Sequence, residues 1–179
     1  MGNICHGSYM RLSQSGWPRA HLAEEVEAYA VKQKPLRRWA AFHEAGHAVM
    51  RIVRQGAATA IDVSDDGSGY SRGTGTSIRV TDKIEIALAG PLAEARARKI
   101  SAAAIFMTGG RQDMENASEL AARWAISVGS DQGAVLREAE ATARRFLRYY
   151  WSAVERLASA VLESGSLSHL EVAAIASIE

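Results

Sequence analysis

Residues 36–55 decide the fold and read LRRWAAFHEAGHAVMRIVRQ. Pro35 precedes this stretch and Gly56 follows it, so the sequence predicts one helix from Leu36 to Gln55. Apolar side chains recur within it at steps of three and four residues, which is typical of a helix with one buried face. The residues of this expected buried stripe are Trp39, Phe42, Val49 and Val53.

The predicted helix contains one His-Glu-x-x-His motif, His43-Glu44-Ala45-Gly46-His47. Residues four apart lie on the same helix face, so the imidazoles of His43 and His47 can bind one metal ion. Glu44 lies one residue beyond His43, where it can take a proton from water at the metal. The alternative is a pair of hydrogen-bonded structural histidines, although burying two imidazoles and a carboxylate without a metal or hydrogen bonds is costly.

A zinc ion at these histidines needs a third protein ligand and keeps its fourth position for water. A metzincin would have Gly and His where Met50 and Val53 stand, so the sequence excludes that class. The remaining carboxylates are Glu85, Glu94 and Asp113. Asp113 is expected in the first turn of a helix, where the helix dipole favours an ionised carboxylate. From the residues alone, Asp113 is equally compatible with a zinc ligand and with a helix cap.

The pattern after residue 56 predicts a small β-hairpin or sheet. Ala60–Val63 reads as a short strand, Asp65–Gly69 as a turn, and Thr74–Val80, rich in β-branched residues, as a second strand. We expect this second strand to pair with an extended polypeptide substrate, although an internal strand of the sheet is the alternative. The substrate-binding residues expected there are Thr74, Gly75 and Thr76.

The rest of the sequence is patterned as helices, so the expected fold class is α+β and mainly α-helical. The next helix is expected to begin with Thr81 or Asp82 as its N-cap, with Glu85 completing a capping box. Pro91 is expected to kink or split that helix, because proline cannot donate a backbone hydrogen bond. The other predicted features are a turn at Thr108–Gly110, a helix at Gln112–Val128 closed by Gly129, a helix at Gln132–Glu163, and a last short helix with a capping box of Ser168 and Glu171.

The composition, with 179 residues of which 47% are hydrophobic and 23% charged, is that of a single globular domain. We expect an irregular lead-in at residues 1–18 and one domain over residues 19–179, beginning with a short helix at His21–Lys32. The net charge of +1 favours neither nucleic acid nor an anionic membrane as a partner. Cys5 is the single cysteine, which favours a cytoplasmic location. The most apolar stretch, Ile84–Ala95, is interrupted by charged residues, so no membrane-spanning helix is predicted.

Three stretches, in the same order, resemble the protease domain of the FtsH-type ATP-dependent zinc metallopeptidases. His43–Val49 looks like the zinc helix of that family. Ala87–Glu94 is similar to its Gly-Gly-x-Ala-Ala-Glu helix, and Thr108–Asp113 to its Thr-Gly-Ala-x-Asn-Asp turn. The resemblance extends over residues 37–178.

This resemblance implies an FtsH protease-like fold and Zn2+ as the cofactor. It also implies that His43, His47 and Asp113 are the zinc ligands and Glu44 the general base, with Glu94 as the alternative third ligand. The implied activity is that of a zinc-dependent endopeptidase acting on unfolded or flexible polypeptides.

The sequence contains no Gly-x-x-x-x-Gly-Lys-Ser/Thr loop, which such a family uses to bind ATP. Unfolding of a substrate would therefore need a separate ATPase partner, and a homo-oligomer is also compatible with the resemblance. The other class of function is a catalytically idle interaction or regulatory module that docks on an ATPase or a homologous ring. The intact Glu44 argues against that reading, because loss of the base is the simplest route to an inactive relative.

Overall fold

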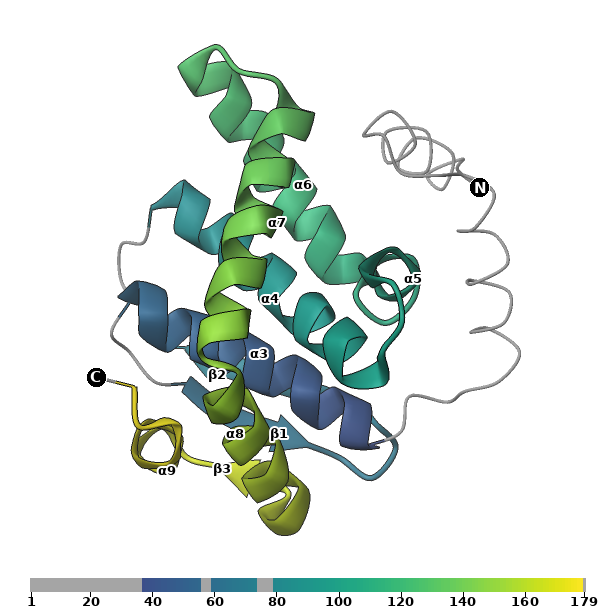
Figure 1. Cartoon of the computed structure of the whole chain (residues 1–179), viewed down its shortest axis with the longest axis vertical. Coiled ribbons are helices and arrows are strands. Elements are labelled where there is room, and N and C mark those ends of the chain that lie inside the picture. Colours follow the sequence, from purple (N-terminus) through teal and green to yellow (C-terminus); the bar gives the residue numbers. More distant parts are fainter. Residues whose placement is uncertain (1–36, 56–58, 74–78, 179) are drawn as a thin grey trace.

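The computed structural model describes residues 37–55, 59–73 and 79–178, and Figure 1 shows their arrangement. The elements in chain order are α3 (Arg37–Gln55), β1 (Thr59–Val63), β2 (Gly69–Gly73), α4 (Val80–Arg98), α5 (Ala102–Phe106), α6 (Arg111–Val128), α7 (Gln132–Tyr149), α8 (Trp151–Ser164), β3 (Ser166–Leu167) and α9 (His169–Ala176). This mainly helical set with a small sheet confirms the predicted α+β class. The expected lead-in at 1–18, the helix at His21–Lys32 and the residues Thr74, Gly75 and Thr76 lie outside the described ranges.

α3 lies at the centre of the fold, as its apolar periodicity predicts. It contacts α4, α7, α8 and α9 as well as β1 and β2. Figure 1 shows α7 running across α4 and α3, with the sheet and α9 together at one end of the fold. Ala41, Ala45 and Ala48 are fully buried, as are Val49 and Met50. Of the expected buried stripe, Trp39, Phe42 and Val53 are only half-buried. Small side chains on its buried face let other helices approach α3 closely.

The closest approach is between α3 and α4 at Gly46. A Cβ atom on Gly46 would lie 2.6 Å from the Cβ of Ala93 and 2.7 Å from the carbonyl oxygen of Ala89. Two turns further along α3, Arg54 forms an ion pair with Glu85, which comes earlier in α4. The two helices therefore run antiparallel, with their backbones in contact at Gly46.

The sheet has the order β2-β1-β3, and both pairings of the central strand β1 are antiparallel. Thr59, Ile61 and Val63 of β1 face the core, as alternation along the strand requires. Within the described part of the chain, β2 is an edge strand, because β1 is its single neighbouring strand.

Of the predicted second strand, Thr74–Val80, only Arg79 and Val80 lie within the described ranges, and neither belongs to a strand. β2 spans Gly69–Gly73, and Val80, expected at the end of a strand, is instead the first residue of α4. A tight turn explains the early start: the Ser64 N–H donates to the carbonyl of Ser68, and Gly67 adopts a left-handed φ of 84°. Gly69, the first residue of β2, was predicted as part of the turn, but the hairpin pairing overrides its low strand propensity.

Three helix predictions also need correction. α4 begins at Val80, so neither Thr81 nor Asp82 is its N-cap; Asp82 accepts hydrogen bonds from Arg79, and Glu85 pairs with Arg54 rather than completing a capping box. Pro91 was expected to kink or split this helix; it lies inside α4, so the expected split is wrong. α5 and the two-residue strand β3 were not predicted.

The predicted helix Gln132–Glu163 is divided at Tyr150 into α7 and α8. α7 packs mainly on α4 and α6, whereas α8 packs mainly on α3 and α9. The ring of Trp151, at the start of α8, stacks on Phe42 of α3 with their centroids 5.8 Å apart. Since no Gly or Pro marks the division, the sequence gives no local signal for it.

The remaining boundaries agree with the sequence predictions. α6 ends at Gly129 in a left-handed cap, and the capping box of Ser168 and Glu171 opens α9. No helix in the described ranges combines the length and apolar character needed to cross a membrane.

The contact at Gly46 generates a prediction for Gly46→Ala. The added methyl group overlaps backbone of α4, at a cost of about 1–3 kcal/mol that outweighs a gain of about 1 kcal/mol in helix propensity. We expect a lower urea midpoint in equilibrium unfolding of protein treated with a chelator. Gly133→Ala in α7 is the matched control, because a Cβ there meets only side-chain atoms of Arg137 and Asp131 at 3.1 Å. Equal midpoints for wild type and Gly46→Ala would contradict the close helix contact.

Candidate metal centre

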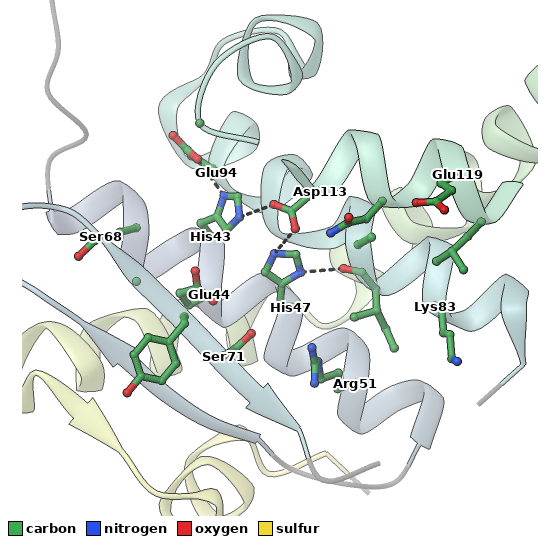
Figure 2. Close-up of a pocket in the computed structure, with 18 of the residues that line it drawn as sticks. His43, Glu44, His47, Arg51, Ser68, Ser71, Lys83, Glu94, Asp113 and Glu119 are labelled. Atoms are coloured by element: carbon green, nitrogen blue, oxygen red, sulfur yellow. Dashed lines mark hydrogen bonds and ion pairs between the residues drawn. The ribbon is translucent and has the colours of Figure 1, made fainter. Parts of the chain in front are cut away.

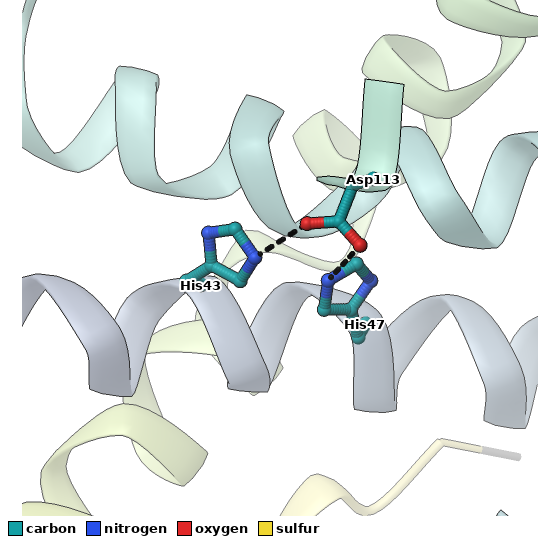
Figure 3. Close-up of side chains that lie close together, drawn as sticks. All are labelled: His43, His47 and Asp113. Carbon is teal, nitrogen blue, oxygen red and sulfur yellow. Dashed lines mark hydrogen bonds and ion pairs between the residues drawn. The ribbon is translucent and has the colours of Figure 1, made fainter. Parts of the chain in front are cut away.

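Three side chains converge where α3 meets the start of α6, as Figure 3 shows. His43 and His47 project from one face of α3, and Asp113 projects from the first turn of α6. His43 Nε2 lies 3.0 Å from Asp113 Oδ2, and His47 Nε2 lies 3.5 Å from Asp113 Oδ1. The side chains of the two histidines expose only 12% and 10% of their surface, and Asp113 exposes 23%.

The Nδ1 atoms of both histidines are held by acceptors on α4. His47 Nδ1 donates to the backbone carbonyl of Ile86 at 2.7 Å, and a carbonyl can only accept. His43 Nδ1 lies 3.0 Å from Glu94 Oε2, and Arg98 donates to the other oxygen of Glu94 at 2.8 Å. These bonds orient both rings so that their Nε2 atoms face Asp113, the arrangement that acceptors around a metal site produce.

The spacing of the three groups fits a divalent metal ion. One ligand atom from each of His43, His47 and Asp113 can be chosen so that all three lie within 4.8 Å of one another. The two Nε2 atoms approach different oxygens of the Asp113 carboxylate, at 3.0 and 3.5 Å, so all three side chains face one point. Two imidazole nitrogens and one carboxylate oxygen form a donor set that can hold a metal ion.

Two glycines make this convergence possible. A Cβ on Gly90 of α4 would overlap the ring of His47, so only glycine leaves room for the ring between the helices. A Cβ on Gly110 would lie 2.6 Å from the side chain of Pro91, the next residue of α4. Because Gly110 directly precedes α6, its contact with Pro91 fixes where the first turn of α6, and with it Asp113, lies relative to α3.

Glu44 lies beside the three groups, at the floor of a cavity of about 810 Å3. Its side chain is buried, and Gly69 of β2 passes so close that a Cβ there would lie 3.0 Å from Glu44 Cγ. α3, the β1–β2 turn, β2, α4 and α6 form the walls of the cavity, and Figure 2 shows the residues that point into it. A carboxylate, two imidazoles and a second carboxylate thus share one open cavity.

The charges of the site shift the protonation of its members strongly. Burial by itself lowers the pKa of His43, but the hydrogen bonds to Asp113 and Glu94 and the charge of Glu44 raise it to about 10. Burial by itself raises the pKa of Asp113, but the hydrogen bonds and positive charges of His43 and His47 hold it well below its usual range. His43 therefore carries a proton at neutral pH that a metal ion must displace.

The structure separates the carboxylates that the sequence left open. Asp113 faces the Nε2 atoms of both histidines, whereas Glu94 contacts the opposite nitrogen of His43 and acts as a positioning residue. Glu85 pairs with Arg54 away from the histidines. The sequence reasoning missed Ser68, Gly69 and Ser71 as cavity residues, because it placed the second strand after them, and it missed Arg51. The signal for Arg51 was present, since it lies four residues beyond His47 on the same face of α3.

The comparisons with known proteins add no family assignment: no protein-family model matches the chain, and neither does any curated protein.

The contrast between Asp113 and Glu94 generates the first prediction for this site. Asp113→Ala removes a metal-binding group, so zinc affinity should fall by more than the roughly 10–100-fold that loss of an outer partner costs. Glu94→Ala should fall within that 10–100-fold range, and Glu94→Gln, which keeps an acceptor for His43 Nδ1, should be closer to wild type. Competition titration with a zinc-binding dye measures these affinities, and circular dichroism checks the fold. A greater loss of zinc affinity in Glu94→Ala than in Asp113→Ala would indicate that Glu94 is the metal ligand and Asp113 the outer partner.

The raised pKa of His43 generates a second prediction, for protein treated with a chelator. The raised pKa of His43 contributes fully to the stability of the fold below pH 6.5, the ordinary pKa of histidine. This contribution is lost as the pH rises through about 10, the pKa of His43 in the folded protein. The urea midpoint should therefore decrease between pH 6.5 and 10, with a shallower decrease in His43→Gln. His169→Gln, at the exposed start of α9, should keep the wild-type slope. Identical slopes in all three proteins would contradict the assigned pKa.

Proposed function

We propose that the chain is a zinc-dependent endopeptidase that hydrolyses peptide bonds in unfolded or flexible polypeptides. The observation that supports this most is the convergence of His43, His47 and Asp113 next to the buried Glu44, all at the floor of one cavity. A purely structural cluster would not need to open onto a cavity of this size.

The donor set supports zinc as the metal. Two imidazoles and one carboxylate are the protein ligands typical of catalytic zinc sites, which keep a further position for water. When zinc is bound, it supplies Lewis acidity that polarises the scissile carbonyl and lowers the pKa of water to about 7.

Glu44 is the residue proposed to move the proton. It precedes Ala45 on α3 and follows His43 directly, so it borders the ligand set without belonging to it. In the proposed reaction its carboxylate accepts a proton from the attacking water and then delivers it to the amine nitrogen of the leaving group. The close backbone of Gly69 limits the positions open to the Glu44 side chain, which favours a fixed geometry for this transfer.

The edge strand β2 supports a polypeptide as the substrate. Residues 67–71, which include the first half of β2, line the same cavity as Glu44. An extended chain lying along an edge strand forms backbone hydrogen bonds with little dependence on its sequence. The predicted substrate-binding residues Thr74, Gly75 and Thr76 directly follow β2 in the sequence and lie outside the described ranges.

The role of Glu44 generates the test of this function. Glu44→Gln should retain zinc and the fold but lower the turnover of an unfolded protein by at least about 100-fold, the typical contribution of a positioned base. Turnover is measured by mass spectrometry of the products with zinc-loaded protein. Glu138→Gln on the exposed face of α7 is the matched control and should cleave like wild type.

Two results would contradict the proposal. Equal turnover by wild type and Glu44→Gln would show that the hydrolysis does not come from this site. No turnover by either protein would favour the interaction or regulatory module instead.

A further inference from the structure

Arg51 places a positive charge in the cavity, one helical turn beyond His47 on α3. It lines the cavity together with the three metal-binding groups and Glu44. Figure 2 shows Arg51 and Lys83 on one side of His47, with Glu94 on the other side. The cavity therefore has a basic end next to the candidate metal centre.

The guanidinium of Arg51 is held between α3 and β2. A Cβ on Gly73 would overlap Arg51 Nη1, so the absence of a side chain at Gly73 makes room for the guanidinium against the strand. The Nε atom is buried and meets no hydrogen-bond acceptor among the described residues. Of the described side chains with such an unsatisfied atom, Arg51 alone lines the cavity.

Arg54, less than one turn further along α3, shows how this protein satisfies a buried arginine. Its guanidinium pairs with Glu85 and Asp82 and lies over the ring of Phe146 at 4.4 Å. Within the described ranges, Arg51 has neither a carboxylate ion partner of this kind nor a ring beneath it. Desolvation of its guanidinium is costly, so an anionic partner in the cavity that Arg51 lines would be bound favourably by this side chain.

The surroundings of Arg51 favour an anion as that partner. Burial lowers the pKa of Arg51, and the negative charge of Glu44 opposes this effect. The exposed Lys83, in the first turns of α4, contributes a second positive charge to the same end of the cavity. Glu119 also lines this part of the cavity, but it is paired with Arg123.

We propose that Arg51, assisted by Lys83, binds a carboxylate of the substrate and so gives the peptidase a preference for acidic sequences. This inference rests on the proposed function. Four residues of α-helix span about 6 Å, and an extended chain advances about 3.3 Å per residue. The recognised carboxylate therefore belongs to a residue within about two positions of the scissile bond. It is either an Asp or Glu side chain or the C-terminal carboxylate of a short product-like peptide.

Peptide binding tests the inference without requiring cleavage. The protein is zinc-loaded Glu44→Gln, and the probes are fluorescent peptides that carry one Glu moved through successive positions, each with a Gln-containing partner. A second pair has a free or an amidated C-terminus. Fluorescence anisotropy should give a Kd about 10- to 100-fold lower for the carboxylate member of one pair, as expected for a hydrogen-bonded ion pair. The pair that shows this difference identifies whether a side chain or the C-terminus is recognised.

Changes at Arg51, made in the same Glu44→Gln background, assign the preference to this residue. Arg51→Gln should bring the ratio of Kd values close to one, and Arg51→Lys, which keeps the charge, should retain part of the preference. Arg137→Gln, on the exposed face of α7 and away from the cavity, is the control that should keep the full ratio. Thermal unfolding checks that each variant is folded. Equal Kd values for all pairs, or a preference that persists in Arg51→Gln, would overturn the inference.

The two proposals can fail separately. A carboxylate preference that depends on Arg51, without any cleavage by the wild type, would support the anion-binding role of Arg51 and contradict the peptidase activity. Cleavage that depends on Glu44, without a carboxylate preference, would support the peptidase activity and contradict the role of Arg51.

Discussion

The close contact between α3 and α4 at Gly46 is the constraint on which the rest of the structure depends. It brings Gly90 against the ring of His47 and Pro91 against Gly110. The second of these contacts positions the start of α6, from which Asp113 reaches back toward α3. Three side chains from two helices, α3 and α6, thus converge because α3 and α4 touch at a residue without a side chain. Because protein interiors are close-packed, a change in the distance between α3 and α4 would shift the helices packed against them.

The same contact buries carboxylates on α4, and their partners come from α3 and from α4 itself. Glu85 and Glu94 are nearly fully buried. Arg54 pairs with the first, and His43 together with Arg98 holds the second. A buried carboxylate is tolerated only with such partners. The contact between His43 and Glu94 therefore joins the two helices and also orients His43 toward Asp113.

The sequence was informative where a local signal exists. The boundaries of α3 and α6 follow from Pro35, Gly56 and Gly129, and the spacing of His43 and His47 alone predicts that they share a helix face. The residues alone left the choice between Asp113 and Glu94 open, because both carboxylates lie far from α3 in the sequence, and only the family resemblance implied Asp113. The position of β2 was missed because its glycines are required by Glu44 and Arg51 beneath the strand, a tertiary reason that no strand propensity contains. The break at Tyr150 is likewise set by where α8 packs.

The positions of the three metal-binding groups differ in how easily local unfolding can reach them. α3 is enclosed by four helices and two strands, so opening it requires the loss of most of the core. Asp113 instead lies in the first turn of α6, and helix ends fray at little cost. Transient opening of that turn would detach the carboxylate while both imidazoles stay in place. Exchange of a bound metal ion with solvent would then follow the amide hydrogen exchange of the α6 start, and not the much slower exchange expected for α3.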